Sequence, residues 1–304
     1  MRIGIMMGPD RVAHTIDKIV AMSKQAEAAG LDNVWMANIR AHDAITALAI
    51  AGRETTRIGV GTAVTPSYPR HPIALAQQAL TAAAATKGRF TLGIGLSHKV
   101  VIEHVHGLSY AQPANHMQEY LAILMPLLRG ETATHEGKHY RVQDITLGTP
   151  DAQPPPVVLA ALGPLMLKLA GTYADGTNTW MVGSRTMKNH IVKRIAHAAA
   201  EAGKKNPLIV GGFPVVVTDN PKKIKQALAE PLALYGQLPR YRAMLDLEGV
   251  SDPTDLAIVG NESQVLEKIQ SFRHIGVTDF MAAIFELEAD AFERTLALLS
   301  AAIN

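Results

Sequence analysis

The chain has 304 residues and no cysteine, and its 29 Lys and Arg against 27 Asp and Glu give a formal net charge of +2. With 48% hydrophobic and 18% charged residues it is not a disordered protein, and its length suits two ordinary domains or one large α/β barrel. The lack of cysteine excludes disulfides, thiolate catalysis and Cys-ligated metal centres. The near-neutral charge predicts no nucleic-acid partner.

The chain is interpreted as cytoplasmic and as free of membrane-spanning segments. The first residues, MRIGIMMGPDR, contain too short an apolar run for a signal peptide. Pro, Asp, Lys or Arg interrupts every candidate run before it reaches the roughly 18 apolar residues that a membrane span needs. We therefore expect no membrane partner.

Short apolar runs alternate with longer amphipathic runs along the whole chain. The predicted strands are residues 1–6, 33–37, 57–62, 90–95, 155–159, 176–182, 207–217 and 278–284. The predicted helices are residues 12–29, 42–53, 72–86, 113–128, 165–173, 190–202 and 289–303. This alternation requires right-handed crossovers and a parallel sheet.

The number of strand–helix units predicts one closed (β/α)8 TIM barrel over residues 1–304. Two stretches interrupt the rhythm, and we expect a hairpin insertion near residues 132–154 and a helical insertion near residues 220–254. A doubly wound sheet with a separate helical domain is the alternative fold.

The segment HEGKH, His135 to His139, matches the zinc-protease pattern H-E-x-x-H. That chemistry needs two histidines one helical turn apart. Here Gly137 and Lys138 indicate a turn, and the flanking residues alternate as in strands. We therefore predict a solvated hairpin and no metal site.

Two glycine pairs, Gly59/Gly61 and Gly93/Gly95, begin the dinucleotide pattern G-x-G-x-x-G but do not complete it. Glycines inside barrel strands more often permit close approach of a backbone or ligand. Three histidines at positions 98, 104 and 106 could bind a metal, although hydrogen bonding is the commoner role for loop histidines.

Leu162-Gly163-Pro164 follows the fifth strand and begins a helix. The amides of Gly163, Leu165 and Met166 would face any anion at that helix N-terminus, which makes this a candidate phosphate site. An ordinary strand-to-helix turn is the alternative.

The residues expected at the mouth of the barrel are mostly apolar or amide-bearing. They are Met6, Met7, Asn38, Val64, Thr65, Ser97, His98, Trp180, Phe213 and Phe285. No paired carboxylates occur among them and the chain has no G-x-S-x-G elbow, so hydrolysis is poorly supported. An apolar mouth with few acids suits a cofactor that supplies its own chemistry.

Residues 61–98, GTAVTPSYPRHPIALAQQALTAAAATKGRFTLGIGLSH, resemble the bacterial-luciferase-like monooxygenase superfamily, and within it the branch that uses the deazaflavin coenzyme F420. Three further blocks resemble it in the same order: AGLDNVWMA (29–37), EGKHYRV (136–142) and VVLAALGPLMLKLAGTYADG (157–176). The resemblance implies a TIM barrel with a helical insertion after strand seven, and it identifies EGKHYRV as the family's inserted hairpin.

The resemblance also implies site residues. A non-prolyl cis peptide at Ala63-Val64 would lie behind the deazaflavin ring, and Asn38 and Thr65 would contact the ring and ribityl chain. The phosphate site would comprise Leu162, Gly163, Leu165 and Met166.

The sequence departs from the glucose-6-phosphate dehydrogenase branch in ways that exclude a sugar phosphate substrate. His98 stands where that branch has a catalytic Glu, and Ile39 where it has a catalytic His. Trp180 and Gly183 replace its sugar-phosphate-binding Thr and Lys.

The activity implied is hydride transfer between the deazaflavin C5 and a small unsaturated or imine-like substrate, with pterin- and folate-like molecules included. His98 is the candidate proton donor or cofactor hydrogen-bonder, and a purely structural His98 is the alternative. Trp180, Tyr68 and Phe285 would form the substrate wall or belong to the core.

Two other functions stay open: an FMN-dependent monooxygenase of the same superfamily, and a non-catalytic barrel that binds a flavin-like ligand. The apolar outer helix over residues 73–85 predicts a homodimer.

Overall fold

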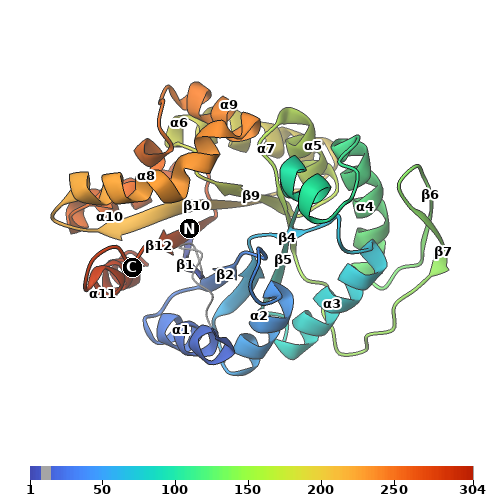
Figure 1. The fold of residues 1–304 in the computed structure, drawn as a ribbon. Coiled ribbons are helices and arrows are strands. Elements are labelled where there is room, and N and C mark those ends of the chain that lie inside the picture. Colours follow the sequence, from blue (N-terminus) through green and yellow to red (C-terminus); the bar gives the residue numbers. More distant parts are fainter. Residues whose placement is uncertain (8–14, 304) are drawn as a thin grey trace.

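The computed structural model describes residues 1–7 and 15–303, and its centre is a closed barrel of parallel strands (Figure 1). The barrel strands are β1 (Arg2–Met7), β2 (Asn33–Met36), β3 (Gly59–Thr62), β5 (Phe90–Gly95), β8 (Val157–Ala160), β9 (Gly176–Trp180), β10 (Leu208–Val217) and β12 (Asp279–Ile284). Each pairs with the next, and β12 pairs with both β10 and β1, so the sheet has no free barrel edge. The predicted TIM barrel is confirmed and the open doubly wound sheet is wrong.

Helices surround the barrel and bury their apolar faces against it (Figure 1). They are α1 (Ile16–Ala28), α2 (Ala44–Arg53), α3 (Pro72–Ala85), α4 (Pro113–Leu128), α5 (Pro164–Thr172), α6 (Ser184–Thr186), α7 (Lys193–Glu201), α10 (Glu262–Arg273) and α11 (Ala291–Ala301). Residues 12–14 of the first predicted helix lie outside the described residues. No helix among the described residues is long and apolar enough to cross a membrane.

The inside of the barrel is filled mainly by four buried side chains, Trp35, Val158, Val210 and Met281. The glycine pairs create room for them. A Cβ at Gly61 would lie 2.5 Å from the Trp35 ring, and a Cβ at Gly95 would lie 2.8 Å from Val64. These glycines therefore serve close packing, as expected for glycines in barrel strands.

Strand alternation sends two residues expected at the mouth to the outside of the barrel. Met7 is 2% exposed and accepts a hydrogen bond from Ser23 of α1 at 4.0 Å, whereas its neighbour Met6 packs against the interior cluster. Phe213 packs on Phe272 of α10, with ring centroids 4.5 Å apart. Met7 and Phe213 are thus wrong as mouth residues, because successive side chains of a strand point to opposite faces.

Some elements were not predicted. Strand β11 (Ile258–Gly260) pairs with the far end of β10, and strand β4 (Thr65–Pro66) pairs with β5. Helix α10 begins with a capping box in which Asn261 and Gln264 exchange hydrogen bonds, a sequence signal that was available. Irregular helical turns complete the chain: η1 (Val101–Val105) and η2 (Met187–Val192) are π-helical, and η3 (Pro253–Leu256) is a 3-10 turn.

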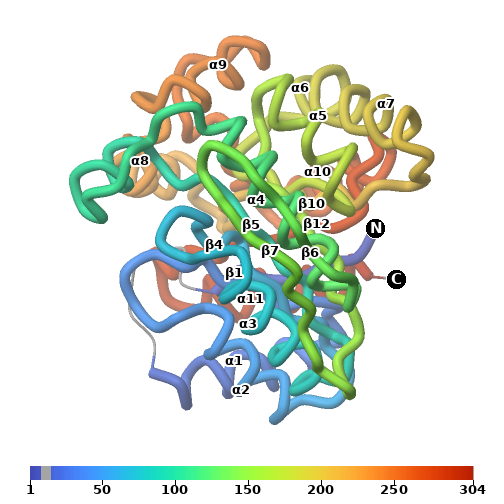
Figure 2. The backbone as a smooth tube through the Cα atoms, turned by 90° about the vertical axis from the view of Figure 1, so that its right-hand side faces the viewer, coloured from blue at the N-terminus to red at the C-terminus, as the bar shows by residue number. Residues whose placement is uncertain are grey.

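Two insertions leave the barrel in different directions. Strands β6 (Ala133–Glu136) and β7 (Arg141–Ile145) form an antiparallel hairpin that stands beside α4 (Figure 1). Helices α8 (Pro221–Gln237) and α9 (Pro239–Glu248) follow the seventh barrel strand, β10. In Figure 2 the two termini lie on the right, and α8 lies on the left with the loops that follow the early strands.

Candidate active site at the barrel mouth

The loops that follow the parallel strands carry the predicted site residues, at the end of the barrel where enzymes of this fold place their chemistry. The Ala63-Val64 peptide bond is cis, as the resemblance implied. The Ala63 amide donates to the Met36 carbonyl at 2.8 Å, and the Asn38 amide donates to the Val64 carbonyl at 3.3 Å. These two hydrogen bonds therefore hold the ends of β2 and β3 together at the mouth.

Asn38 is held by its neighbours through one side-chain atom only. Its Oδ1 accepts from the Ala44 amide at 3.0 Å and from Arg70 at 3.4 Å. Arg70 is also paired with Asp43. Burial alone would raise the pKa of Asp43, but hydrogen bonds from Thr46 and the charge of Arg70 lower it. No hydrogen bond from the Asn38 Nδ2 group reaches another described residue, so this donor is available to a ligand.

Three polar atoms at or beside the mouth are buried and have no partner among the described residues: Thr65 Oγ1, Trp180 Nε1 and Tyr68 Oη. Trp180 packs against both the interior of the barrel and the cluster under the helical insertion. Buried polar groups nearly always have partners in native proteins. Within the described part of the chain, five further buried side-chain atoms also lack a hydrogen-bond partner, at Trp35, His135, His139, Asn178 and Thr186. The three at the mouth are the ones that a ligand bound there would satisfy.

Tyr68 stacks on a buried histidine that the sequence interpretation missed. The His116 ring lies parallel to the Tyr68 ring, with centroids 3.9 Å apart. Its Nε2 shares a hydrogen bond with Ser67 Oγ at 3.0 Å, and its Nδ1 lies 3.5 Å from Tyr140 Oη. Burial, followed by the nearby His139, lowers the pKa of His116 to about 4. This histidine is neutral at pH 7 and fixes the segment after the cis bond.

His98 follows β5 and faces the helical insertion. Its ring is tilted against that of Tyr241 in α9, with centroids 6.2 Å apart. Burial lowers the pKa of His98, so its ring is neutral at pH 7. The other two histidines of this loop, His104 and His106, are exposed on η1 and just beyond it.

The candidate phosphate site lies at the N-terminus of α5, where Gly163 is the N-cap and Pro164 the first helical residue. No side chain caps this helix, which leaves the amides of Leu165 and Met166 free for an anion. The Leu162 carbonyl is bonded to His190 Nε2 at 2.7 Å, which holds the turn in place.

Arg240 of α9 also reaches this turn, and sequence reasoning had missed it. A Cβ built on Gly163 would lie 3.5 Å from the Arg240 guanidinium, and no ion pair joins Arg240 to another described residue. A cation from the insertion thus meets a helix N-terminus from the barrel, and both favour an anion.

Phe285 lies in a different environment from the one expected. It is 2% exposed, in a cluster with Val216 of β10 and residues of the insertion. Trp180 and Tyr235 pack against that cluster. Phe285 therefore lies behind the Trp180 and Tyr235 rings, and it does not lie beside Tyr68.

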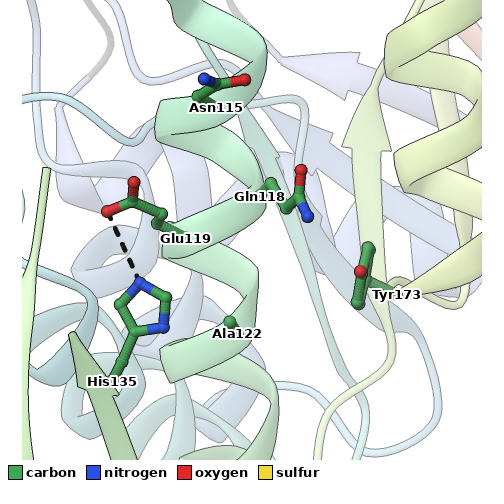
Figure 3. A pocket seen from close by; sticks show the side chains of 6 residues that line it. All are labelled: Asn115, Gln118, Glu119, Ala122, His135 and Tyr173. Atoms are coloured by element: carbon green, nitrogen blue, oxygen red, sulfur yellow. Dashed lines mark ion pairs between the residues drawn. The ribbon is translucent and has the colours of Figure 1, made fainter. Parts of the chain in front are cut away.

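Two hollows lie away from the mouth. The larger, about 270 Å³, opens between α4, the hairpin and α5. Figure 3 shows Glu119 and His135 facing one another on one side of it, with Gln118 and Tyr173 on the other. The Glu119 carboxylate accepts from the amides of Lys138, His139 and Tyr140 at 3.0, 2.8 and 3.1 Å.

These contacts assign Glu119 to the hairpin and leave it no role as an acid or base. Burial would raise its pKa, but the three amide donors lower it. The HEGKH segment spans β6 and the turn, so His135 and His139 are not one helical turn apart. The described residues contain no cluster of three potential metal-ligating side chains.

The smaller hollow, about 220 Å³, lies under the helical insertion beside α10. Its Glu248 accepts from the Arg185 and Thr186 amides at 3.1 and 2.7 Å, so it caps the short helix α6. Glu119 and Glu248 thus hold backbone amides, Asp255 in the smaller hollow pairs with Lys225, and we place the candidate chemistry at the mouth.

Comparison with known proteins identifies the family of the chain. The family model described as luciferase-like monooxygenase matches residues 1–279. A putative coenzyme F420-dependent oxidoreductase of Mycobacterium tuberculosis is 31% identical over 226 residues, which cover 69% of this chain and 65% of that protein. The 5,10-methylenetetrahydromethanopterin reductase of Methanolobus tindarius is 30% identical over 190 residues, 62% of this chain and 57% of the reductase.

Solved structures show the same fold at lower identity. An F420-dependent secondary alcohol dehydrogenase in complex with an F420-acetone adduct superposes with a TM-score of 0.82 at 19% identity, covering 100% of this chain and 99% of the other. The oxygenating constituent of 3,6-diketocamphane monooxygenase from Pseudomonas putida, in complex with FMN, has a TM-score of 0.79 at 19% identity, with 99% and 96% covered. The chain belongs to the luciferase-like monooxygenase family, and several of its relatives are oxidoreductases named for coenzyme F420.

Proposed function

We propose that this protein binds coenzyme F420 at the barrel mouth and transfers hydride between it and an organic substrate. The observation that carries the proposal is the set of three buried, unpartnered polar atoms of Thr65, Tyr68 and Trp180. They stand in a region with no acid pair and no metal-binding cluster among the described residues. Such a site positions a cofactor and contributes little chemistry of its own.

The residues at the mouth suit the three parts of a deazaflavin cofactor: its ring system, its ribityl chain and its phosphate. Asn38 Nδ2 and Thr65 Oγ1 would hydrogen-bond the ring system and ribityl chain beside Ala63 and Val64. The amides of Gly163, Leu165 and Met166, with the Leu162 turn beneath them, would bind the phosphate, and Arg240 would neutralise its charge. When bound, the deazaflavin supplies the atom that accepts or gives hydride.

His98 would move the proton that accompanies this transfer. Its ring is neutral at pH 7 because burial lowers its pKa, and no hydrogen bond engages its nitrogens within the described part of the chain. A neutral imidazole takes up the proton that a hydroxyl or amine substrate loses on oxidation, and returns it in the reverse direction. Trp180 and Tyr68 would shield the site from water, with Phe285 supporting Trp180 from behind.

The decisive experiment is a titration of the purified protein with F420 and, separately, with FMN, in which the quenching of cofactor fluorescence is followed. We expect saturable F420 binding well below about 100 μM, which corresponds to roughly 5.5 kcal/mol. Absence of saturation at that concentration overturns the proposal. Saturable binding of FMN but not of F420 would indicate a flavin monooxygenase instead. One such monooxygenase, solved with FMN bound, shares this fold.

A substitution at the barrel mouth tests whether F420 binds there. Thr65→Val removes the unpartnered hydroxyl and keeps the shape of the side chain. We expect F420 affinity to fall about fivefold, since one hydrogen bond in a buried site contributes roughly 1 kcal/mol. Thr91→Val, in β5 on the same barrel, is the matched control and should bind F420 as the native protein does.

A further inference from the structure

Four aromatic rings form a continuous arc across the barrel mouth. Trp180 at the end of β9 lies 6.2 Å from Tyr235 of α8, Tyr235 lies 4.9 Å from Tyr241 of α9, and Tyr241 lies 6.2 Å from His98, all between ring centroids. Of the outer two rings, Trp180 ends strand β9 and His98 lies in the loop after β5, and the middle two rings belong to the insertion. Helices α8 and α9 therefore bridge one side of the mouth to the other.

The arc carries no charge at neutral pH. Burial raises the pKa of Tyr241, and the neighbouring Tyr235 raises it further. Burial lowers the pKa of His98. A wall made of uncharged rings binds flat or apolar groups well, and it penalises a charged substrate that has to give up its water.

An exposed apolar rim continues from the arc. Five of the nine large apolar side chains exposed among the described residues lie in segments that follow barrel strands at this end: Ile39, Val100, Val105, Leu108 and, in the first turn of α5, Leu165. Val105 and Ile39 are 63% and 66% exposed. These loops follow β2, β5 and β8, and only β3 intervenes between β2 and β5 in the barrel.

The rim loop after β5 is the one that also carries His98. Val100 precedes the π-helical turn η1, Val105 is its last residue, and Leu108 follows three residues later. In Figure 2 this turn projects on the same side of the molecule as α8. Apolar side chains that project into water at a site entrance mark a surface that a ligand covers.

We infer that the substrate is a bulky, uncharged and largely apolar molecule, which would lie along the aromatic arc with its apolar remainder on the rim of Val100, Val105 and Leu108. This inference rests on the proposed function and narrows its substrate. This class differs from the pterin- or folate-like class that the sequence favours, and the ketone and carboxylate titrations below distinguish the two. We choose a substrate as the occupant of the rim because the rim residues and His98 of the proposed site lie on the same loop.

The test uses the F420-loaded protein and methyl ketones of increasing length, 2-butanone, 2-hexanone, 2-octanone and 2-decanone, titrated by calorimetry. We expect the Kd to fall two- to fourfold with each methylene, since a fully buried methylene changes an equilibrium about fourfold. The ketone 9-oxodecanoate, with a carboxylate at the end that would reach the rim, should bind at least tenfold more weakly than 2-decanone. Ketones that bind equally at all lengths overturn the inference.

Substitutions in the rim test whether the apolar part of the ketone binds there. Val105→Ser combined with Leu108→Ser should weaken 2-decanone three- to tenfold and leave 2-butanone and F420 affinity unchanged. Ile50→Ser, an exposed apolar residue of α2, is the matched control and should change neither. A Tyr241→Leu variant should weaken both long and short ketones, because it removes a ring beside His98.

The outcomes separate the two proposals. Failure of F420 to bind sinks the proposed function, while the same ketone titrations of the free protein still test the rim. F420 binding without chain-length dependence sinks only the inference. The inference is also wrong if the rim variants leave ketone binding unaffected and change another property. A changed sedimentation mass would show that the rim binds a second copy of the chain, and changed binding to phosphatidylcholine vesicles would show that it binds a membrane.

Discussion

The two insertions in this barrel interrupt the strand–helix rhythm equally clearly, yet they have opposite consequences. The hairpin β6–β7 is fixed to α4 through Glu119, whose carboxylate accepts three of its amides. The helical insertion brings Tyr235, Tyr241 and Arg240 over the mouth. The Glu119 carboxylate has both its oxygens engaged by backbone amides, which makes the hairpin a stabilising element. The ring arc and the cation at the α5 N-terminus are the reasons why we propose α8 and α9 as part of the site.

If this comparison is right, changes on the hairpin side alter stability without altering cofactor affinity, and changes on the insertion side do the reverse. The predictions that follow test each half of that statement.

The largest effect is expected from acid, through His116 beside the hairpin residue Tyr140. The pKa of His116 is about 4 in the folded protein and 6.5 when exposed, so between these values the unfolded chain binds the extra proton. Stability is therefore complete above about pH 6.5, falls as the pH falls, and has lost roughly 3 kcal/mol at pH 4 and below.

Urea unfolding at several pH values measures this loss. His116→Gln keeps a partner for Ser67 and cannot titrate, so its stability should depend less on pH by that amount. Equal pH dependence in the variant and the native protein would contradict the assignment of a buried neutral histidine.

The next effect is expected at Glu119. Glu119→Ala leaves three hairpin amides without their acceptor, and we expect a loss of about 2 kcal/mol in the free energy of unfolding. Glu136→Ala is the control, because Glu136 pairs with Arg141 at the surface, with both side chains over three-quarters exposed, and such pairs contribute little. F420 affinity should be unchanged in both; a large loss of affinity in Glu119→Ala would give the hairpin a part in the site.

On the insertion side, Gly163→Asp is expected to weaken F420 at least tenfold. The new carboxylate would meet Arg240 at the α5 N-terminus and occupy the place of the phosphate. The side chain fits, since its Cβ would be 3.5 Å from its nearest neighbour, so the melting temperature should stay within about 2 °C. Gly163→Ala adds a Cβ with neither a charge nor a capping oxygen and should keep most of the affinity; equal losses in both variants would point to crowding instead of the carboxylate.

The sequence predicts the barrel well because periodicity reports burial, and each barrel strand is buried on both faces. It misplaces Met7 and Phe213 because one residue of register separates the inside of a strand from its outside. It predicts the helix start at Gly163 correctly because a glycine before a proline at a helix start is a local signal. Arg240, Tyr241 and His116 carry no such signal: each meets its partner only when an insertion or a distant helix folds back over the mouth.

The smallest effect, and the one most specific to the insertion, is expected at Arg240. Arg240→Gln removes the charge from an exposed position, where water and salt weaken its interaction with an anion, so F420 affinity should fall only about threefold at low salt. Arg240→Lys should keep most of the affinity. The informative measurement is the combination with Gly163→Asp: if the carboxylate introduced by that substitution acts by pairing with Arg240, the double variant binds F420 no more weakly than Gly163→Asp alone. Additive losses would show that Arg240 and the α5 N-terminus bind different parts of the ligand, and the insertion would then contribute a second, separate contact to the site.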